Sequence, residues 1–149
     1  MQVGDICTRE VVCASSETTV AAAARTMRQY HIGDVVVTRL ENGRRIPLGI
    51  VTDRDIVIGV VATDLAPNTL TVGDIMGTEL ATAQESEDVF DAVQRMRNKG
   101  VRRMPIVDAN NDLVGIVSID DIIEILAEEM NQLAHLISRE QMHERDARR

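Results

Sequence analysis

Aromatic side chains are nearly absent from this chain of 149 residues, which has one Tyr, one Phe and no Trp. The hydrophobic fraction is nevertheless 44%. A folded core must therefore be built from aliphatic residues, alanine and methionine. Without aromatic rings the chain lacks the stacking platforms on which single-stranded nucleic acids bind, so this class of function is not expected.

Positive charge is also scarce. The formal net charge is −8, which argues against a nucleic-acid backbone as a partner. The basic residues are arginines except for Lys99. Because the forked guanidinium suits phosphate and carboxylate, a local anion site remains open to this acidic chain.

Cysteine is limited to Cys7 and Cys13. The spacing of these two residues, with no histidine cluster nearby, makes a poor metal site, so no metal is expected. The sequence shows neither a signal-peptide pattern nor an apolar run long enough to span a membrane. We therefore expect a reduced cytoplasmic protein without a membrane partner, in which both thiols are small apolar fillers.

The most informative feature is an internal repeat. Val3–Ile6 recurs as Val72–Ile75, and Gly49–Ile56 returns in similar form as Gly115–Ile122. A repeat of about sixty residues is too long for a solenoid unit and too short for an easy solitary fold. Two halves packed about a pseudo-twofold axis are therefore expected, with the function in the cleft between them.

Each half follows a β-α-β-β-α pattern of hydrophobic periodicity and turn signals, which predicts an α+β fold. The predicted domains are 1–62 and 72–127, joined by a linker at 63–71 and followed by an extension at 128–149. Strands are expected at 10–13, 35–37, 48–51, 80–83, 104–107 and 113–117, and helices at 19–30, 52–61, 86–99 and from 119 onward.

The last predicted helix continues beyond the point where its counterpart in the first half ends. Its apolar stripe is made of Ile122, Leu126, Met130, Leu133 and Ile137. This stripe either folds back on its own domain or forms a coiled-coil-like contact with a second subunit, and we favour the second reading. Beyond Ser138 the chain is almost wholly polar, and we expect it to fray.

The motif Gly-Ile-Val-[Thr/Ser]-x-x-Asp ends the third strand of each half and contains Thr52 with Asp55, and Ser118 with Asp121. Taken alone, it is typical of a helix capping box. Its presence in both halves, with Asp rather than Glu, also fits a ligand site. A helix N-terminus and a hydroxyl suit a phosphate, and a carboxylate suits the hydroxyls of a ribose.

Two arginines, Arg102 and Arg103, precede the strand expected at 104–107. They form either a solvated rim or the positive charge that a phosphate requires. The repeat places Gly33 and Asp34 at the equivalent positions of the first half. The two sites of the pair are therefore predicted to be unequal.

Together, the doubled β-α-β-β-α unit, the repeated Gly-Ile-Val-[Thr/Ser]-x-x-Asp motif and the segment Val-Arg-Arg-Met-Pro-Ile-Val resemble a tandem pair of CBS domains (a Bateman module). The resemblance covers about residues 1–126 and is closest to small stand-alone bacterial or archaeal proteins. It implies nucleotide sites between the halves. The first site implied consists of Ile50, Thr52, Asp55, Leu80, Ala81, Val101, Arg102 and Arg103.

The resemblance also implies a role for most of these residues. Asp55 would hold the ribose, and Thr52 with Arg103 would meet phosphate. The side chains of Ile50, Leu80 and Val101 would enclose adenine, while backbone groups near Ala81 and Val101 would read its edge. A second, weaker site implied in the same way consists of Val11, Val12, Ile32, Gly33, Asp34, Ser118 and Asp121. Because Asp34 replaces an arginine, that site accepts a nucleoside, a ligand with a positive centre, or nothing.

No catalytic set is visible, because His31, His135 and His143 lie apart from any nucleophile–base pairing. We expect a regulatory, non-enzymatic homodimer that binds AMP, ADP or ATP, needs no obligatory cofactor and signals to an unknown effector protein. The family also accepts S-adenosylmethionine and dinucleotides. The rival interpretation is a ligand-free dimerisation scaffold. A nucleotide hydrolase, a third possibility, would need residues that the sequence does not show.

Overall fold

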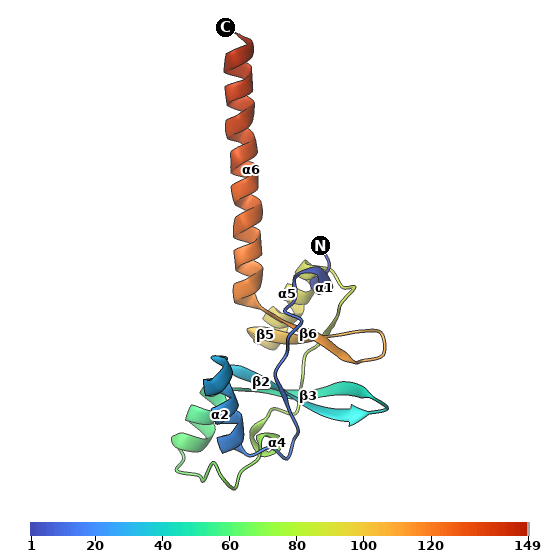
Figure 1. The fold of residues 1–149 in the computed structure, drawn as a ribbon, viewed down its shortest axis with the longest axis vertical. Coiled ribbons are helices and arrows are strands. Elements are labelled where there is room, and N and C mark those ends of the chain that lie inside the picture. Colours follow the sequence, from blue (N-terminus) through green and yellow to red (C-terminus); the bar gives the residue numbers. More distant parts are fainter. Residues whose placement is uncertain (149) are drawn as a thin grey trace.

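The computed structural model describes residues 1–148 and consists of two similar α+β halves and a long helix (Figure 1). The first half contains β1 (Cys13–Ala14), α2 (Val20–Tyr30), β2 (Asp34–Glu41), β3 (Arg44–Thr52) and α3 (Asp53–Ile56), which continues as the π-helical turn Val57–Val61. The second contains β4 (Ala83–Gln84), α5 (Val89–Lys99), β5 (Arg103–Val107), β6 (Leu113–Ser118) and α6 (Ile119–Ala147). The predicted α+β fold and the repeated β-α-β-β-α order are confirmed.

Each half has a three-stranded sheet in which the first strand runs parallel to the second and the second pairs antiparallel with the third. The hairpin between β2 and β3 turns at Asn42 and Gly43, whose φ angles of 52° and 78° match the turn that Asn-Gly favours. The two hairpins lie side by side in the middle of the body, and α2 and α5 lie outside them (Figure 1).

The same local signals delimit the equivalent helices α2 and α5. The side chains of Thr19 and Asp88 cap their N-termini by accepting hydrogen bonds from Ala22 N and Phe90 N. Both helices end at a residue in the left-handed conformation, His31 with φ 54° and Gly100 with φ 67°. His31 therefore caps the C-terminus of α2, which gives it a structural role.

The two hydrophobic cores use equivalent positions of the repeat. One is formed by Val20, Ala23, Met27, Val35, Val37, Val51, Ile56, Val60 and Val72. The other is formed by Val3, Ala83, Val89, Ala92, Met96, Met104, Ile106, Val117 and Ile122. As the composition predicts, both are aliphatic apart from methionine sulfur.

The two halves exchange their first helices. The short helix α1 (Val3–Ile6) packs in the core of the second half, where Val3 N donates to Glu87 O at 2.9 Å. Its counterpart α4 (Val72–Ile75) packs in the core of the first half, where Val72 N donates to Thr18 O at 2.8 Å. Each core is therefore completed by the other repeat, which ties the halves together.

Where the chain after α1 crosses β6, the two backbones come close. Thr8 pairs with Ile116 through two hydrogen bonds of 2.9 Å. A Cβ atom on Gly115 would lie 2.6 Å from Cys7 Sγ and 2.9 Å from Thr8 O. This position therefore needs glycine because of a close approach of the backbone.

Two expectations about strand ends differ from the structure. Regular pairing in the first strand of each half begins at Cys13 and Ala83 rather than at residues 10 and 80. The preceding residues, including Val11 and Leu80, stay outside the ladder. Among residues 1–148 the backbone groups of Leu80 and Ala81 have no hydrogen-bond partner and are available to a cavity, whereas Val12 O accepts a hydrogen bond from Val36 N of β2 at 3.1 Å.

The end of α6 also differs from the expectation that the chain frays beyond Ser138. The helix runs to Ala147, and Arg148 pairs with Glu144 one turn earlier at 3.1 Å. Strong helix formers such as Arg139, Glu140 and Gln141 explain this continuation. Past Leu126 the helix leaves the body and projects alone (Figure 1). Arg149, the last residue of the predicted extension, lies outside the described residues.

Candidate functional site

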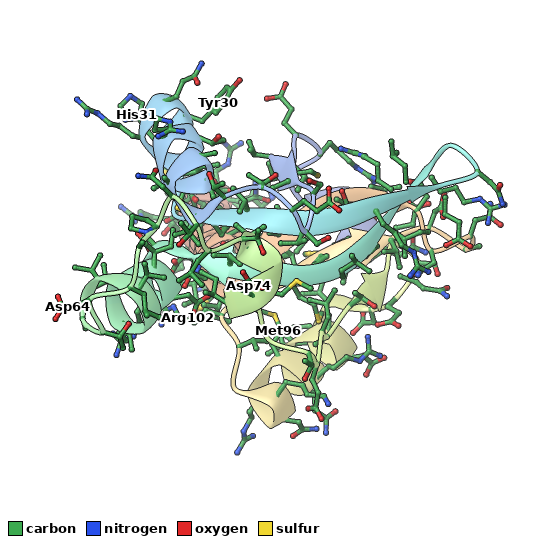
Figure 2. The ribbon with its side chains drawn as sticks, turned by 90° about the horizontal axis from the view of Figure 1, so that it is seen from below. Tyr30, His31, Asp64, Asp74, Met96 and Arg102 are labelled. Carbon is green, nitrogen blue, oxygen red and sulfur yellow. The ribbon has the colours of Figure 1, made fainter. Side chains whose placement is uncertain are left out.

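A cavity of about 460 Å³ lies between the two halves. It is lined by all eight residues that the sequence analysis assigned to the first site: Ile50, Thr52, Asp55, Leu80, Ala81, Val101, Arg102 and Arg103. Three of them come from the first half, at the end of β3 and the start of α3, and five from the second. Figure 2 shows Arg102 beside the helical segment that follows β3. The structure therefore brings the predicted set together, while its ligand-binding role stays a prediction.

The capping interpretation of Thr52 and Asp55 is confirmed. Asp55 N donates to Thr52 Oγ1 at 3.1 Å, and Thr52 N donates to Asp55 Oδ2 at 2.8 Å. Among residues 1–148, Oδ1 of Asp55 has no hydrogen-bond partner. Thr71 and Asp74 form the same box at the start of α4, yet neither lines this cavity. The box itself is therefore structural, and the position of Thr52 and Asp55 in the cavity is what sets them apart.

A second cavity of about 440 Å³ lies at the equivalent place on the other side of the pseudo-twofold axis. It is lined by all seven residues predicted for the second site: Val11, Val12, Ile32, Gly33, Asp34, Ser118 and Asp121. Asp121 N donates to Ser118 Oγ at 3.2 Å, but within the described chain the Asp121 carboxylate has no return bond. The Asp121 carboxylate is therefore less engaged than that of Asp55.

An ion pair joins the two equivalent positions at which the sites are predicted to differ. Nε of Arg103 lies 2.7 Å from Oδ2 of Asp34, and the two side chains are 30% and 23% exposed. Burial raises the pKa of Asp34, Arg103 opposes this rise, and the nearby Asp53 carboxylate adds to it. Arg102 makes a looser pair with Asp120, with 3.2 Å between Nη2 and Oδ1 and both side chains about 70% exposed.

Sequence reasoning missed several lining residues. In the first cavity these are Gly49, Asp53, Arg54, Gly77, Glu79 and Gly100, and in the second Thr8, Glu10, His31, Arg103, Ile116 and Asp120. The repeat held a signal for several of them, because Glu10 with Glu79 and His31 with Gly100 occupy matching positions. Arg103 lines both cavities, and the sequence gives no sign of this. The double role depends on where the pseudo-twofold axis passes through the folded molecule.

Other site classes find no support in the described residues 1–148. No group of three or more His, Cys, Asp or Glu side chains there is arranged to hold a metal ion. None of the described helices is both long and apolar enough to cross a bilayer. Burial raises the pKa of both Cys7 and Cys13, so these thiols stay protonated at neutral pH and are poor nucleophiles.

Two α+β halves that exchange their first helices and enclose two related cavities define a paired-domain module. The family model described as "CBS domain" matches this chain twice, at residues 3–61 and 72–128. The chain belongs to the CBS-domain family.

Relatives include small proteins of the same family. The protein MK0525 of Methanopyrus kandleri is 39% identical over 125 residues, which are 84% of this chain and 62% of that relative, so the match leaves more than a third of MK0525 uncovered. The CBS domain-containing protein YhcV of Bacillus subtilis is 38% identical, with 80% of this chain and 81% of the relative covered.

Among the solved structures that match the fold are two CBS-domain proteins whose structures contain adenosine compounds. PAE2072 of Pyrobaculum aerophilum, complexed with AMP, has a TM-score of 0.73 and 26% identity over 81% of this chain and 89% of its own. The CBS domain pair of MJ0100, in complex with 5′-methylthioadenosine and S-adenosyl-L-methionine, has a TM-score of 0.72 and 29% identity over 87% and 98%. Binding of an adenosine compound is therefore a property of these two relatives.

Proposed function

We propose that this protein is a regulatory module that binds an adenine nucleotide of the AMP, ADP and ATP class in the first cavity. The observation that carries the proposal is the convergence there of a helix N-terminus with Thr52 and Asp55 from one half and of Arg102 and Arg103 from the other. The Thr52 hydroxyl suits phosphate, arginines supply positive charge, and a carboxylate suits ribose. The AMP complex of PAE2072 supports this choice of ligand class.

The aliphatic side chains of the first cavity suit the base of the nucleotide. Ile50, Leu80 and Val101 line it, and Val101 is 39% exposed. A purine that covers such side chains removes apolar surface from water, which stabilises the complex. Leu80 and Ala81 lie outside the strand ladder and their backbone groups have no hydrogen-bond partner among residues 1–148, so these groups are available to the edge of the base.

Binding draws on both halves, which suggests how a signal arises. A ligand that contacts the start of α3 and the start of β5 favours the arrangement in which these contacts form together. A nucleotide therefore shifts the angle between the halves only as far as it binds one arrangement better than another. We propose that an effector protein recognises the shifted arrangement. Hydrogen exchange of α3 and β5 with and without AMP reports this change.

Calorimetry with AMP, ADP, ATP and adenosine tests the ligand assignment directly, and thermal unfolding supplies a second readout. A ligand that binds only the native state raises its stability by about 2.7 kcal/mol at a hundred times its dissociation constant. The rival function, a ligand-free dimerisation scaffold, predicts no heat of binding and no shift with any of the four compounds at millimolar concentration.

We further propose that the protein acts as a homodimer whose second copy covers α6. Along this helix Met130, Leu133 and Ile137 are 57–70% exposed, and their spacing continues the heptad-like stripe from Leu126. The first half of α6 contains five acidic residues and no basic one, whereas the second contains Arg139 and Arg145 beside Glu140, Glu144 and Asp146. Two antiparallel copies place the acidic half of one helix beside the more nearly neutral half of the other, so like charges repel less than in a parallel pair.

A further inference from the structure

Two cavities with unequal charge share one arginine. The first cavity is lined by Asp53, Asp55 and Glu79 and by Arg54, Arg102 and Arg103, so acids and bases balance. The charged lining of the second consists of Glu10, Asp34, Asp120, Asp121 and Arg103, in addition to His31. An anion is therefore compatible with the first cavity, whereas the second favours a ligand that carries positive charge or none.

The shared arginine lies at the point where the two halves are most nearly symmetric. Arg103 begins β5 and pairs with Ser118, while Asp34 begins β2 and pairs with Thr52. These equivalent positions face each other across the pseudo-twofold axis and form the 2.7 Å ion pair. Arg103 lines both cavities, whereas Asp34 lines only the second.

The Arg103 guanidinium approaches Asp34 through Nε, which lies 2.7 Å from Oδ2 in an ion pair. Within residues 1–148 its two terminal nitrogens have no hydrogen-bond partner. A phosphate in the first cavity can accept from them without displacing Asp34. A phosphate, Arg103, Asp34 and a cation in the second cavity then form a row of alternating charges.

We infer that an anionic ligand in the first cavity and a cationic adenosine ligand in the second strengthen each other's binding through the Arg103–Asp34 pair. This inference rests on the proposed function of the first cavity. A phosphate weakens the hold of Arg103 on Asp34, so the Asp34 carboxylate attracts a cation more strongly. A cation beside Asp34 in turn leaves more of the Arg103 charge for the phosphate, as reciprocal linkage requires.

Partial burial makes this path effective. Both side chains of the pair are less than one third exposed, so water and salt screen their interaction less than that of surface charges. The second pair that joins the cavities, Arg102 with Asp120, is about 70% exposed and is expected to contribute little. Asp120→Asn is therefore a matched control for Asp34→Asn, because each removes one carboxylate of the second cavity that is paired with an arginine.

Calorimetry with a matched pair of probes tests the inference. S-adenosylmethionine carries a sulfonium charge, and S-adenosylhomocysteine lacks that charge and one methyl group. In the wild-type protein, saturating AMP should strengthen S-adenosylmethionine binding by on the order of tenfold, with an equal effect in the reverse titration. Saturating AMP should increase the affinity for S-adenosylhomocysteine markedly less. Asp34→Asn should remove the difference between the probes, and Asp120→Asn should keep most of it.

Several outcomes overturn the inference. If S-adenosylmethionine competes with AMP, both ligands occupy the first cavity. If S-adenosylmethionine at millimolar concentration does not bind in the presence of AMP, the second cavity does not accept it. Equal gains for both probes exclude a role for charge. In each of these cases AMP still binds and the proposed function stands, whereas failure of AMP to bind on its own overturns the proposed function itself.

Discussion

Asp34 and Arg103 occupy equivalent positions in the two halves of the molecule, and their side chains meet with 2.7 Å between Oδ2 and Nε. At the symmetry axis of a repeat, similar side chains from equivalent positions usually lie beside each other. Here the two copies have opposite charges at this position, so the pair both joins the halves and makes their cavities different.

The difference between the two carboxylates of the repeated motif is directly testable. Asp55→Ala should weaken AMP binding far more than Asp121→Ala, because Asp55 shares its cavity with Arg102 and Arg103 whereas Asp121 lines the cavity of Asp34. Loss of a carboxylate that accepts both ribose hydroxyls costs about 2–3 kcal/mol. Calorimetry on the two variants measures the difference.

The capping role of Asp55 requires its own control. Asp74→Ala breaks the same kind of box at α4, away from both cavities, so it should lower the melting temperature by a similar amount while leaving AMP affinity unchanged. Equal losses of affinity for Asp55→Ala and Asp121→Ala contradict the assignment of AMP to the first cavity.

Arg103→Ala should reduce the affinity for AMP and ATP but spare adenosine. The guanidinium is assigned to phosphate, so a ligand without phosphate should not sense its loss. Since the substitution also leaves Asp34 without its partner, the double variant Asp34→Asn, Arg103→Ala should be compared by calorimetry as well. If adenosine binding falls as far as AMP binding in both variants, Arg103 contacts the nucleoside instead.

The pH dependence of stability should reveal the environment of Asp34. Because burial raises its pKa, the native state binds more protons than the unfolded state between the folded-state pKa and the usual value near 3.9. Stability contributed by this group therefore rises as the pH falls through the folded-state pKa and levels off below the unfolded one. Asn cannot titrate. In urea unfolding from pH 7 to pH 4, the free energy of unfolding of the wild type should rise relative to that of Asp34→Asn. If the difference between the two free energies stays constant over this range, burial does not raise the pKa of Asp34.

Close approach of the exchanged N-terminal segment to β6 predicts that Gly115→Ala is destabilising. The new Cβ would lie 2.6 Å from Cys7 Sγ and 2.9 Å from a backbone oxygen of Thr8, and forcing them apart should cost about 1–3 kcal/mol. Gly59→Ala is the matched control, since nothing lies within 4 Å of its Cβ position and alanine favours a helical backbone. Urea unfolding of both variants provides the measurement. A Gly115→Ala protein as stable as Gly59→Ala would show that the crossing is looser than described.

The repeat is what made the fold predictable. Two copies of one pattern specify the order of strands and helices twice, and the residues that flank the strand-to-helix turn identify both candidate sites. The exchange of α1 and α4 was not predictable in this way, because Val-Gly-Asp-Ile has the same sequence whichever half it packs against. The sharing of Arg103 was missed for a related reason, since a sequence alignment pairs Arg103 with Asp34 as equivalents and does not indicate that they touch.

The prediction of where α6 ends was also wrong. The polar composition after Ser138 predicts fraying, but arginine, glutamate and glutamine are good helix formers and the helix continues. Apolar residues identify a helix by its buried face, so a solvent-exposed continuation without such a face gives only a weak signal.

Truncation after Ala127 should leave a folded module and weaken its dimer. The core of the second half ends with Ile122 and the adjoining Leu126, so the fold does not require the later turns. Burial of Met130, Leu133 and Ile137 against a second copy contributes about 1.5–3 kcal/mol for each side chain, less the cost of ordering them. Sedimentation equilibrium should therefore show a dimer constant weaker by several decades.

A matched pair of point variants separates the apolar stripe of α6 from its charge. Leu133→Glu places a carboxylate on the stripe, whereas Gln132→Glu adds the same charge one residue away, outside the stripe. Leu133→Glu should weaken the dimer as strongly as the truncation does, because a charge in an apolar contact loses its hydration, while Gln132→Glu should have little effect. Both variants retain a helix-forming residue, so helix content measured by circular dichroism should not change. If the truncated protein and Leu133→Glu dimerise as tightly as the wild type, α6 is not the contact between subunits and the dimer must form through the body.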